Sequence, residues 1–292
     1  MKKNRTSCLV SFVTVALLGL GARANYLAND NFTLSSGFDV TTLTNTESAG
    51  VGKYMVIQGA GSNMYVVSGA SVTPAFGSGN VLKLGDSKST DTFFRQFNGA
   101  ATNFSLSSLS VNQKLDLTFD VQFNGGTLAS AQNFSFGLVN YSSPVSIIFA
   151  NVDLSSAALA SEFRYRTGSY NMSSAGPTVG TAWTESPTVL TNTSYTLGFS
   201  VTKDESNNFI VAYSRNGTTV SSQTLLSTST WGTTMAGLNI QGVAFRQCTV
   251  PNVETYIDNV LVSIPEPTTG MLLLLGCGGT MLLRRWRAER GE

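Results

Sequence analysis

The sequence predicts an all-β protein, in which one β-sandwich domain fills most of the 292 residues between two short apolar segments at the ends. Three observations predict this fold. Residues 114–123, KLDLTFDVQF, alternate apolar and polar side chains throughout. Residues 195–225 have the pattern of three strands joined by two polar turns. Between the two terminal segments, no stretch has apolar residues at helical spacing, so helices are not expected there.

The segment 114–123 is the clearest strand. Successive side chains of a strand point to opposite faces of the sheet, so alternation indicates one buried and one exposed face. The apolar face carries Leu115, Leu117, Phe119, Val121 and Phe123, and the polar face carries Lys114, Asp116, Thr118, Asp120 and Gln122. Phe119 lies at the centre of the apolar row, and we expect it to be buried.

The segment 195–225 is expected to form a meander. We predict a strand at 195–201, a polar turn at 203–208, and strands at 208–215 and 218–225. Asn216 and Gly217 predict a tight hairpin turn, because Gly and Asn tolerate positive φ. Further strands are expected at 53–58, 64–68, 80–84, 92–97, 103–109, 133–139, 145–150, 162–167, 238–246 and 255–263. Many short strands with Gly, Asn and Ser turns favour a sandwich or jelly roll.

The composition excludes several classes of chemistry. The chain contains no His, which rules out Ser-His-Asp and Cys-His sites and His-bound zinc. In the body, residues 25–263, the only cysteine is Cys248, so an internal disulfide cannot form there. The body carries five Lys and five Arg against nine Asp and five Glu, a net charge of −4. No nucleic acid is expected as a partner, because phosphate binding needs a basic surface.

The N-terminal segment, residues 1–24, has the pattern of a signal peptide. Basic residues precede an apolar run of 14 residues, 8–21, which is too short to span a bilayer comfortably. Ala22 and Ala24 fit the small-x-small pattern before a cleavage site. We therefore expect export through the Sec translocon and a mature chain that begins at Asn25.

A second apolar run, residues 268–283, lies near the C-terminus. A helix of this length would measure about 24 Å, shorter than the roughly 30 Å hydrocarbon core of a bilayer. Basic residues follow it at Arg284, Arg285, Arg287 and Arg290. By the positive-inside rule these arginines stay cytoplasmic and leave the body outside. A plain single-pass anchor would not need the tripeptide Pro265-Glu266-Pro267 that precedes the run.

The tripeptide, the apolar run and the arginine cluster together resemble a PEP-CTERM sorting signal, over residues 264–288. The resemblance implies that exosortase, a membrane-embedded enzyme like a cysteine protease, recognises Pro265-Glu266-Pro267 and processes the tail. It also implies a bacterium that makes exopolysaccharide, extracellular matrix or flocs. The two prolines suit such recognition, because they keep the tripeptide out of a helix.

The order of strand patterns in the body resembles that of concanavalin A-like and laminin-G-like jelly rolls. The resemblance rests on the meander 195–225 and on a last strand, ETYIDNVLVSI, that leads directly into the tail. The run from Ile257 to Val260, Ile-Asp-Asn-Val, is similar to the strand before the tripeptide in many PEP-CTERM proteins. The resemblance implies a single β-sandwich domain over residues 25–263.

A glycoside hydrolase would need paired carboxylates, and the nearest pair along the chain is Glu254 and Asp258. On a strand these side chains share a face but lie about 13 Å apart. Glycoside hydrolases separate their two carboxyl groups by about 5–9.5 Å. We therefore expect no catalytic residues, and we expect Asp258 to cap or orient a neighbouring loop.

Two other ligand sites are left open by the sequence. Trp183 and Trp231, both in stretches expected to be loops, could stack on a sugar ring, with burial at the sandwich edge as the alternative. The polar turn 204–208 offers oxygen ligands for calcium. Because no known calcium pattern is present, a solvated hairpin turn is favoured there.

We therefore predict an exported protein of the cell envelope or extracellular matrix, anchored transiently or stably in the inner membrane by its C-terminal helix. Its expected partners are the Sec translocon, an exosortase-type enzyme and exopolysaccharide, with no cofactor and no metal ion. The first hypothesis is a non-catalytic structural or exopolysaccharide-associated role. A lectin-like carbohydrate-binding module is the second, and exposed clustered aromatic side chains would favour it. A glycoside hydrolase is the third, and two facing carboxylates in a groove would favour it.

Overall fold

The computed structural model describes residues 24–30, 32, 38–39, 47–48, 52–58, 65–84, 91–97, 104–125, 133–140, 145–153, 159–165, 183–189, 192–248 and 253–265. Residues Tyr26–Ser263 form one compact unit, which is described here by itself. No helix in the described ranges is both long and apolar enough to cross a bilayer. The predicted apolar runs, Ala22, Glu266, Pro267 and the four C-terminal arginines lie outside the described residues.

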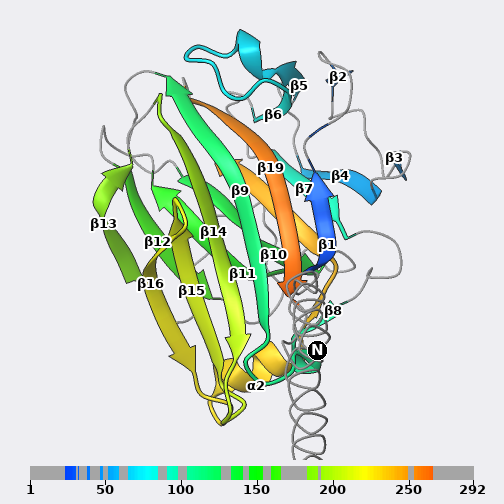
Figure 1. The fold of residues 1–292 in the computed structure, drawn as a ribbon, viewed down its shortest axis with the longest axis vertical. Helices are drawn as coiled ribbons and strands as arrows, with labels where there is room; N and C mark the ends of the chain where they lie inside the picture. Colours follow the sequence, from blue (N-terminus) through cyan, green and yellow to red (C-terminus); the bar gives the residue numbers. More distant parts are fainter. Residues whose placement is uncertain are drawn as a thin grey trace, which may run out of the picture. The chain divides into compact units, whose positions relative to one another are not determined.

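The first of two large sheets has nine strands (Figure 1). They are β1 (Ala24–Asp30), β2 (Phe38–Asp39), β5 (Tyr65–Ser68), β6 (Asn80–Leu84), β9 (Lys114–Gly125), β14 (Ser194–Lys203), β15 (Phe209–Arg215), β16 (Thr218–Leu225) and β19 (Val253–Pro265). The order is β16-β15-β14-β9-β19-β6-β5-β2, and β1 pairs with β19 outside this row. The first and last described strands are therefore neighbours.

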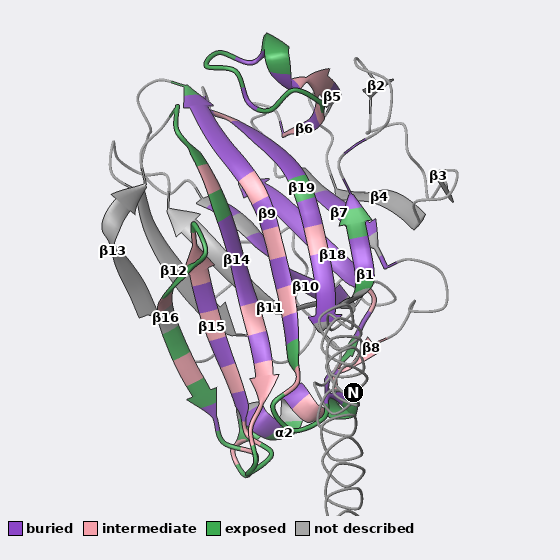
Figure 2. Ribbon diagram, viewed as in Figure 1, coloured by how far each residue is buried: buried purple, intermediate pink, exposed green. Residues whose placement is uncertain are grey.

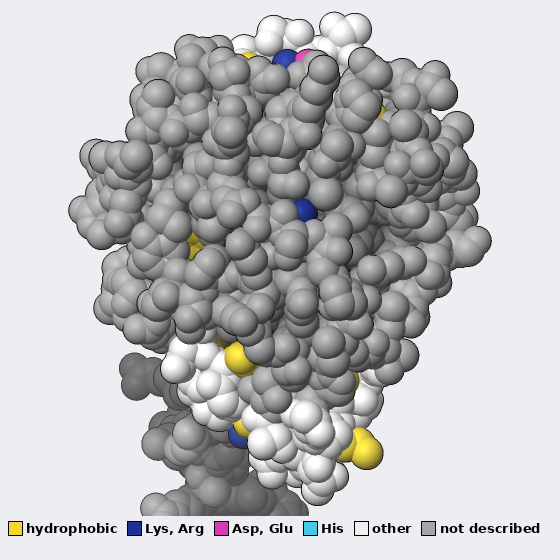
Figure 3. All heavy atoms as spheres, turned by 180° about the vertical axis from the view of Figure 1, so that it is seen from behind, with side chains coloured by type: hydrophobic (Ala, Val, Ile, Leu, Met, Phe, Trp, Pro, Cys, Tyr) yellow, Lys and Arg dark blue, Asp and Glu magenta, His cyan; other side chains and the backbone are white. Residues whose placement is uncertain are grey.

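The second sheet has eight strands, in the order β13-β12-β11-β10-β18-β7-β4-β3. They are β3 (Glu47–Ser48), β4 (Gly52–Gln58), β7 (Asp91–Gln96), β10 (Asn133–Asn140), β11 (Val145–Asp153), β12 (Leu159–Tyr165), β13 (Trp183–Val189) and β18 (Gly242–Cys248). In both sheets the strand pairs of defined register are antiparallel, for example β10 with β11 and β14 with β9. Seen from behind, most of the described atoms that are visible belong to the backbone or to side chains that are neither hydrophobic nor charged (Figure 3).

The remaining elements are short. They are β8 (Phe104–Ser105), β17 (Asn239–Ile240), the 3₁₀ turns η2 (Gly69–Ser71) and η4 (Leu106–Ser108), and the helix α2 (Thr230–Ala236). β8 pairs with β17 in a separate two-stranded sheet. Ser229 caps α2, because its Oγ accepts the backbone N–H of Gly232 at 3.1 Å.

Aromatic rings join the two large sheets. Phe119 on β9 meets Phe136 on β10 and Phe245 on β18 edge-on, with ring centroids 4.6 and 4.9 Å apart. Phe119 is 1% exposed, as the sequence predicts. Such T-shaped contacts are a favoured geometry for buried rings. The two sheets thus pack face to face, and the predicted β-sandwich is confirmed, in a form consistent with a jelly roll.

Burial along β9 alternates as the sequence predicts, with one informative exception (Figure 2). From Leu115 to Val121 every second side chain is buried, but at 121–124 all four are. The segment between β5 and β6 covers the outer face there: Gln122 Nε2 donates to the carbonyl of Pro74 at 2.8 Å, and Asn124 Nδ2 to that of Thr73 at 3.0 Å. The segment between β5 and β6 therefore covers part of the polar outer face of β9.

Most predicted strands are present, and the Asn216-Gly217 turn is confirmed. Both residues have positive φ, 51° and 76°, and Arg215 pairs directly with Thr218. A two-residue loop of this kind matches the twist of the strands it joins. The turn sets the pairing of Arg215 with Thr218, and the register of β15 and β16 then shifts between Tyr213 and Ser214.

Four local predictions were wrong. The strand predicted at 103–109 is instead the two-residue strand β8 followed by η4. Trp183, expected in a loop, is the first residue of strand β13. Trp231 lies in α2, although no helix was expected in the body. The last strand continues to Pro265, the first residue of the tripeptide.

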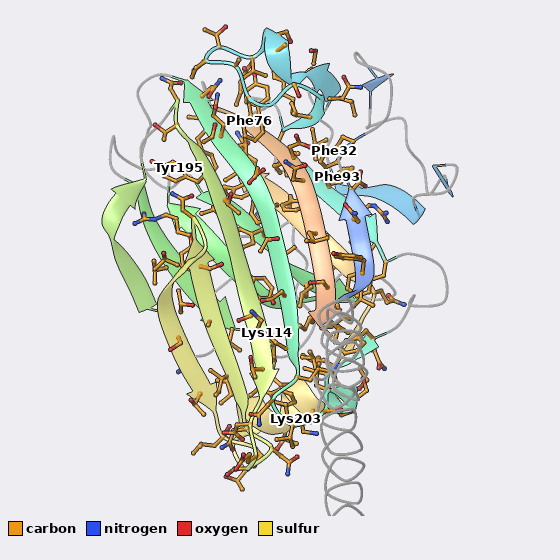
Figure 4. All side chains as sticks on the ribbon, viewed as in Figure 1. Phe32, Phe76, Phe93, Lys114, Tyr195 and Lys203 are labelled. Atoms are coloured by element: carbon orange, nitrogen blue, oxygen red, sulfur yellow. The ribbon has the colours of Figure 1, made fainter. Side chains whose placement is uncertain are left out.

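A buried ion pair also crosses the sandwich. Arg95 shares the inward face of β7 with Phe93, since side chains two residues apart lie on one face of a strand. Its Nε donates to Asp30 Oδ2 at 2.6 Å, and the two side chains are 0% and 1% exposed. Asp30 Oδ1 accepts the N–H of Phe32 at 2.9 Å, and the rings of Phe32 and Phe93 lie nearby, 5.9 Å apart (Figure 4). This pair ties β1 to the opposite sheet.

Candidate functional site

A pocket of about 380 Å³ opens on the outer face of the nine-stranded sheet. Its polar lining consists of Asp120, Ser194, Thr196, Asn216, Asp258 and Asn259. Phe76, Gly77 and Tyr195 complete it, and Phe76 and Tyr195 lie at the same end of the sheet (Figure 4). A volume of this size lies at the lower end of the range of ligand pockets in proteins.

Strand register brings the central residues together. Asp120 on β9 is the direct partner of Thr196 on β14 and of Asp258 on β19. Directly opposed side chains of antiparallel strands have Cβ atoms about 4.5–5.5 Å apart and share a face. The preceding residue on β9, Phe119, is in the core, so these three side chains point outward.

A β-bulge in β19 shapes the floor of the pocket. The register moves from Asp258 opposite Asp120 to Leu261 opposite Thr118, so two residues, Asn259 and Val260, oppose one. Asn259 has φ +51°, a conformation that Asn adopts more readily than most residues. Val260 is buried whereas Asn259 is exposed, so the bulge turns Asn259 to the same side as Asp258.

The segment between β5 and β6 forms the rim. Phe76 packs in a small apolar cluster with Val72, Val81 and Tyr256. The N–H of Phe76 donates to the carbonyl of Gly69 at 3.0 Å. A Cβ at Gly69 would lie 1.9 Å from the carbonyl oxygen of Phe76, so this close approach requires glycine. The rim is thus a folded part of the structure.

The hairpin turn of the meander forms the opposite side. The N–H of Asn216 donates to the carbonyl of Thr196 at 2.7 Å. In return, Asn216 Oδ1 accepts the N–H of Thr196 at 3.0 Å. These two bonds hold the turn against the start of β14. Asn216 therefore serves both the turn and the pocket.

The two carboxylates in the pocket have different environments. Asp120 accepts the hydroxyl of Thr196 at 2.6 Å on Oδ1 and the amide Nδ2 of Asn259 at 2.8 Å on Oδ2. Asp258 Oδ1 accepts the backbone N–H of Asn259 at 2.8 Å. No donor among the described residues reaches Asp258 Oδ2, although this side chain is only 8% exposed. Asp258 Oδ2 is thus an open carboxylate acceptor among the described residues of the pocket.

The pKa of Asp258 also differs from that of an ordinary surface carboxylate. Burial raises the pKa of the Asp258 carboxyl above its usual value, and the nearby charges of Asp120 and Asp30 raise it further. The hydrogen bond from the N–H of Asn259 opposes them in part. None of the nine lining residues carries a positive charge. Among the described residues, the pocket is therefore lined by two acidic side chains and no basic one.

Glu254 does not pair with Asp258, which agrees with the expected distance along the strand. It forms an ion pair with Lys83 and accepts the hydroxyl of Tyr256. Burial alone would raise the pKa of Glu254, but the hydrogen bonds from Lys83 and Tyr256 outweigh it and lower that pKa. Burial and the neighbouring Glu254 raise the pKa of Tyr256. Glu254 thus belongs to a separate network outside the pocket.

In the polar turn at 204–208, the carboxylate of Asp204 accepts hydrogen bonds from other residues of the same turn. Asp204 Oδ1 accepts the N–H groups of Ser206 and Asn208, and Oδ2 accepts the Nδ2 of Asn208 at 2.9 Å. These hydrogen bonds lower the pKa of Asp204. In the described part of the chain, no group of three or more Asp, Glu, Cys or His side chains could hold a metal ion. The arrangement is that of a hairpin turn.

The aromatic candidates Trp183 and Trp231 are placed only by their backbones, in β13 and α2. Their side chains lie outside the described part of the structure, so their role as sugar contacts stays a prediction. The sequence missed Asp120 as a site residue, because its partner Asp258 is 138 residues away and is reached only through strand register. The run of polar residues on the outer face of β9 was the available signal.

No family model matches the chain, and no curated protein matches it. Several solved structures are similar over most of their length. They include a carbohydrate esterase of the Shiga toxin-encoding bacteriophage phi24B, at 14% identity and TM-score 0.49 over 84% of this chain and 100% of that one. An endo-1,3-β-glucanase of Streptomyces sioyaensis matches at 12% identity and TM-score 0.45 over 84% and 97%. The carbohydrate recognition domain of Emp47p matches at 9% identity and TM-score 0.41 over 79% and 98%. These values describe a distant likeness, from which neither ligand nor chemistry is inferred.

Proposed function

We propose that the chain is an exported, polysaccharide-associated surface protein whose β-sandwich binds sugar without cleaving it. The observation that carries the proposal is the pocket on the outer face of the nine-stranded sheet. It gathers carboxylate, amide and hydroxyl groups from three strands and a hairpin turn. Several convergent polar groups in one concavity are typical of a small-molecule binding site.

Sugar suits this lining better than an apolar ligand does. Sugar hydroxyls both donate and accept hydrogen bonds, and the pocket offers acceptors on Asp258 and a side-chain amide on Asn216. Phe76 adds an apolar edge beside the polar floor. The pocket opens on the surface of the sheet, where one unit of a longer polymer could enter while its neighbours stay in solvent.

The hydrogen bonds of Asp120 support the proposal of a non-catalytic role. Both of its oxygens already accept hydrogen bonds, from Thr196 and from Asn259. Two such bonds, one on each oxygen, fix the carboxylate in place. A carboxylate held in this way orients its neighbours, and it is poorly placed to attack a sugar carbon or to activate water.

Export and sorting complete the proposal. The body would cross the membrane behind signal peptide 1–24 and be sorted by a PEP-CTERM signal at 264–288. The concanavalin A-like or laminin-G-like jelly roll would be the exported domain. The support is the pattern of Pro265-Glu266-Pro267, an apolar run and four arginines at one end, with a signal-peptide pattern at the other.

A glycan array tests the binding proposal. The body, residues 25–263, is applied to neutral, amine-bearing and acidic oligosaccharides, together with a Thr196→Val variant that removes a hydroxyl from the pocket. We expect binding to at least one class of glycan, and weaker binding by the variant. A wild-type body that binds none of the glycans would overturn the proposal.

One observation favours a second candidate, a glycoside hydrolase. Asp120 and Asp258 are two carboxylates that face each other in a pocket, and Asp258 has the raised pKa of a general acid. Reducing ends released from polysaccharides by the wild type but not by Asp258→Asn would establish it. Unchanged polysaccharide with the wild type would leave the binding role.

A further inference from the structure

We propose that the pocket selects sugar units that carry a protonated amine over their N-acetylated counterparts and over uronates. This inference rests on the proposed function, because it names the class of sugar that the same site prefers. It starts from the charges around the pocket and from the hydrogen bonds that are already made there.

The charged side chains in the described lining of the pocket are both acidic. Asp120 on β9 and Asp258 on β19 lie directly opposite each other on adjacent strands. Like charges in this position destabilise a sheet. Asp30, a buried carboxylate whose charge also acts on Asp258, has Arg95 as an ion-pair partner. Lys83, likewise, is paired with Glu254. A cation in the pocket would relieve a repulsion that the described residues do not relieve themselves.

The hydrogen bonds point the same way. The hydroxyls of Thr196 and Ser194 are donated to Asp120 and to Gln122, and the amide of Asn259 is donated to Asp120. Asp258 Oδ2 is left as an acceptor without a donor in the described structure. The site therefore needs a ligand that donates at this point. An ammonium group has three donors and no acceptor.

A sugar ammonium fits better than a bare divalent ion. Calcium takes six to eight oxygen ligands, whereas the described lining offers two carboxylates, and no group of three or more acidic side chains in the described structure could hold a metal ion. One open carboxylate oxygen is enough for a charge-assisted hydrogen bond to an amine. Acetylation removes the positive charge of the amine, and a uronate brings a negative charge toward two others, so both should bind less well.

The experiment compares three short oligosaccharides on the full-length chain, purified in a mild detergent. They are an oligomer of glucosamine, its fully N-acetylated form and an oligomer of a uronic acid, measured by titration calorimetry at physiological salt and slightly acidic pH. Short oligomers avoid the non-specific attraction between a polycation and an acidic protein. We expect the glucosamine oligomer to bind about tenfold more tightly than the acetylated one, the difference that one charge-assisted hydrogen bond typically makes.

Two variants make the test specific. Asp258→Asn should bring the ratio of the two affinities close to one. Asp116→Asn removes a carboxylate from the same face of β9, outside the pocket, and should keep the wild-type ratio. Circular dichroism melting curves check that both variants are folded.

The outcomes separate the inference from the proposed function. Equal affinity for the amine and acetylated forms, tighter binding of the uronate, or an unchanged ratio in Asp258→Asn would each overturn the amine preference while sugar binding stands. A preference lost equally in Asp116→Asn would mean that net charge, not the pocket, produces it. Absence of binding to all three oligosaccharides would overturn both.

Discussion

At the scale of single residues, we expect the buried carboxylate of Asp258 to lower the stability of the fold at neutral pH. Asp258 must ionise in a buried place beside Asp120, which raises its pKa. An acidic group whose pKa rises on folding holds its proton more tightly in the folded state. The stability of the fold therefore falls as the pH rises from below the ordinary value of 3.8 through the raised pKa.

We accordingly expect Asp258→Asn to melt at a higher temperature than the wild type at neutral pH. Asn keeps the oxygen that accepts the N–H of Asn259, and it removes the charge. The difference should shrink as the pH falls toward 3.8, and differential scanning fluorimetry across this range measures it. Asp116→Asn, which breaks an exposed pair with Lys114, should change stability by no more than about 1 kcal/mol. A lower melting temperature for Asp258→Asn at neutral pH would contradict the expected repulsion.

Phe119 packs between the two sheets, where its ring contacts Phe136 and Phe245 of the opposite sheet. Phe119→Ala should lower the free energy of unfolding by about 3–5 kcal/mol, the usual cost of a large cavity. Thr118→Ala, on the half-buried outer face of the same strand, should cost less than about 1 kcal/mol. Urea denaturation of both variants compares them. Equal losses would mean that the outer face of β9 is packed as tightly as the inner one.

At the scale of elements, the segment between β5 and β6 can be tested apart from the sheets. Gly69→Ala places a Cβ 1.9 Å from the carbonyl oxygen of Phe76, so the rim must move. We expect a loss of about 1–3 kcal/mol and weaker sugar binding, because Phe76 and Gly77 line the pocket. Gly79→Ala meets nothing within 4 Å and is the matched control in the same segment. Limited proteolysis should cut the rim faster in the first variant alone.

Sequence patterns predicted those elements whose signals are local. Alternation identified β9 and β14, and Asn216-Gly217 identified the hairpin turn. Helix α2 was missed because TWGTTMA has few good helix formers, and it forms with Ser229 as its cap. The pair of Asp120 and Asp258 could not be predicted, because it depends on strand register and on a bulge at Asn259. The same strand pattern with another register would have separated the two carboxylates.

At the scale of the whole molecule, the sorting signal and a plain anchor differ in one substitution. Glu266→Ala should leave membrane insertion intact and block removal of the tail, because an anchor needs only the apolar run and the arginines. Gel mobility and membrane fractionation in a host with an exosortase-type enzyme compare the variant with the wild type. The variant should be heavier by the mass of the tail and stay in the inner membrane. The same size and location for both proteins would leave residues 268–283 as an anchor.

The pairing of β1 with β19 has a consequence for the order in which the chain can mature. The first of the described strands, β1, pairs with the last of them, β19, so this pair can form only after β19 has been made. Contacts between residues so far apart in sequence are the slow ones in folding. Until synthesis is nearly complete, Asp30 also lacks a finished sheet from which to reach Arg95. We therefore expect the sheet to close only after β19 has been made, and an unclosed chain is the form that a narrow protein-conducting channel can thread.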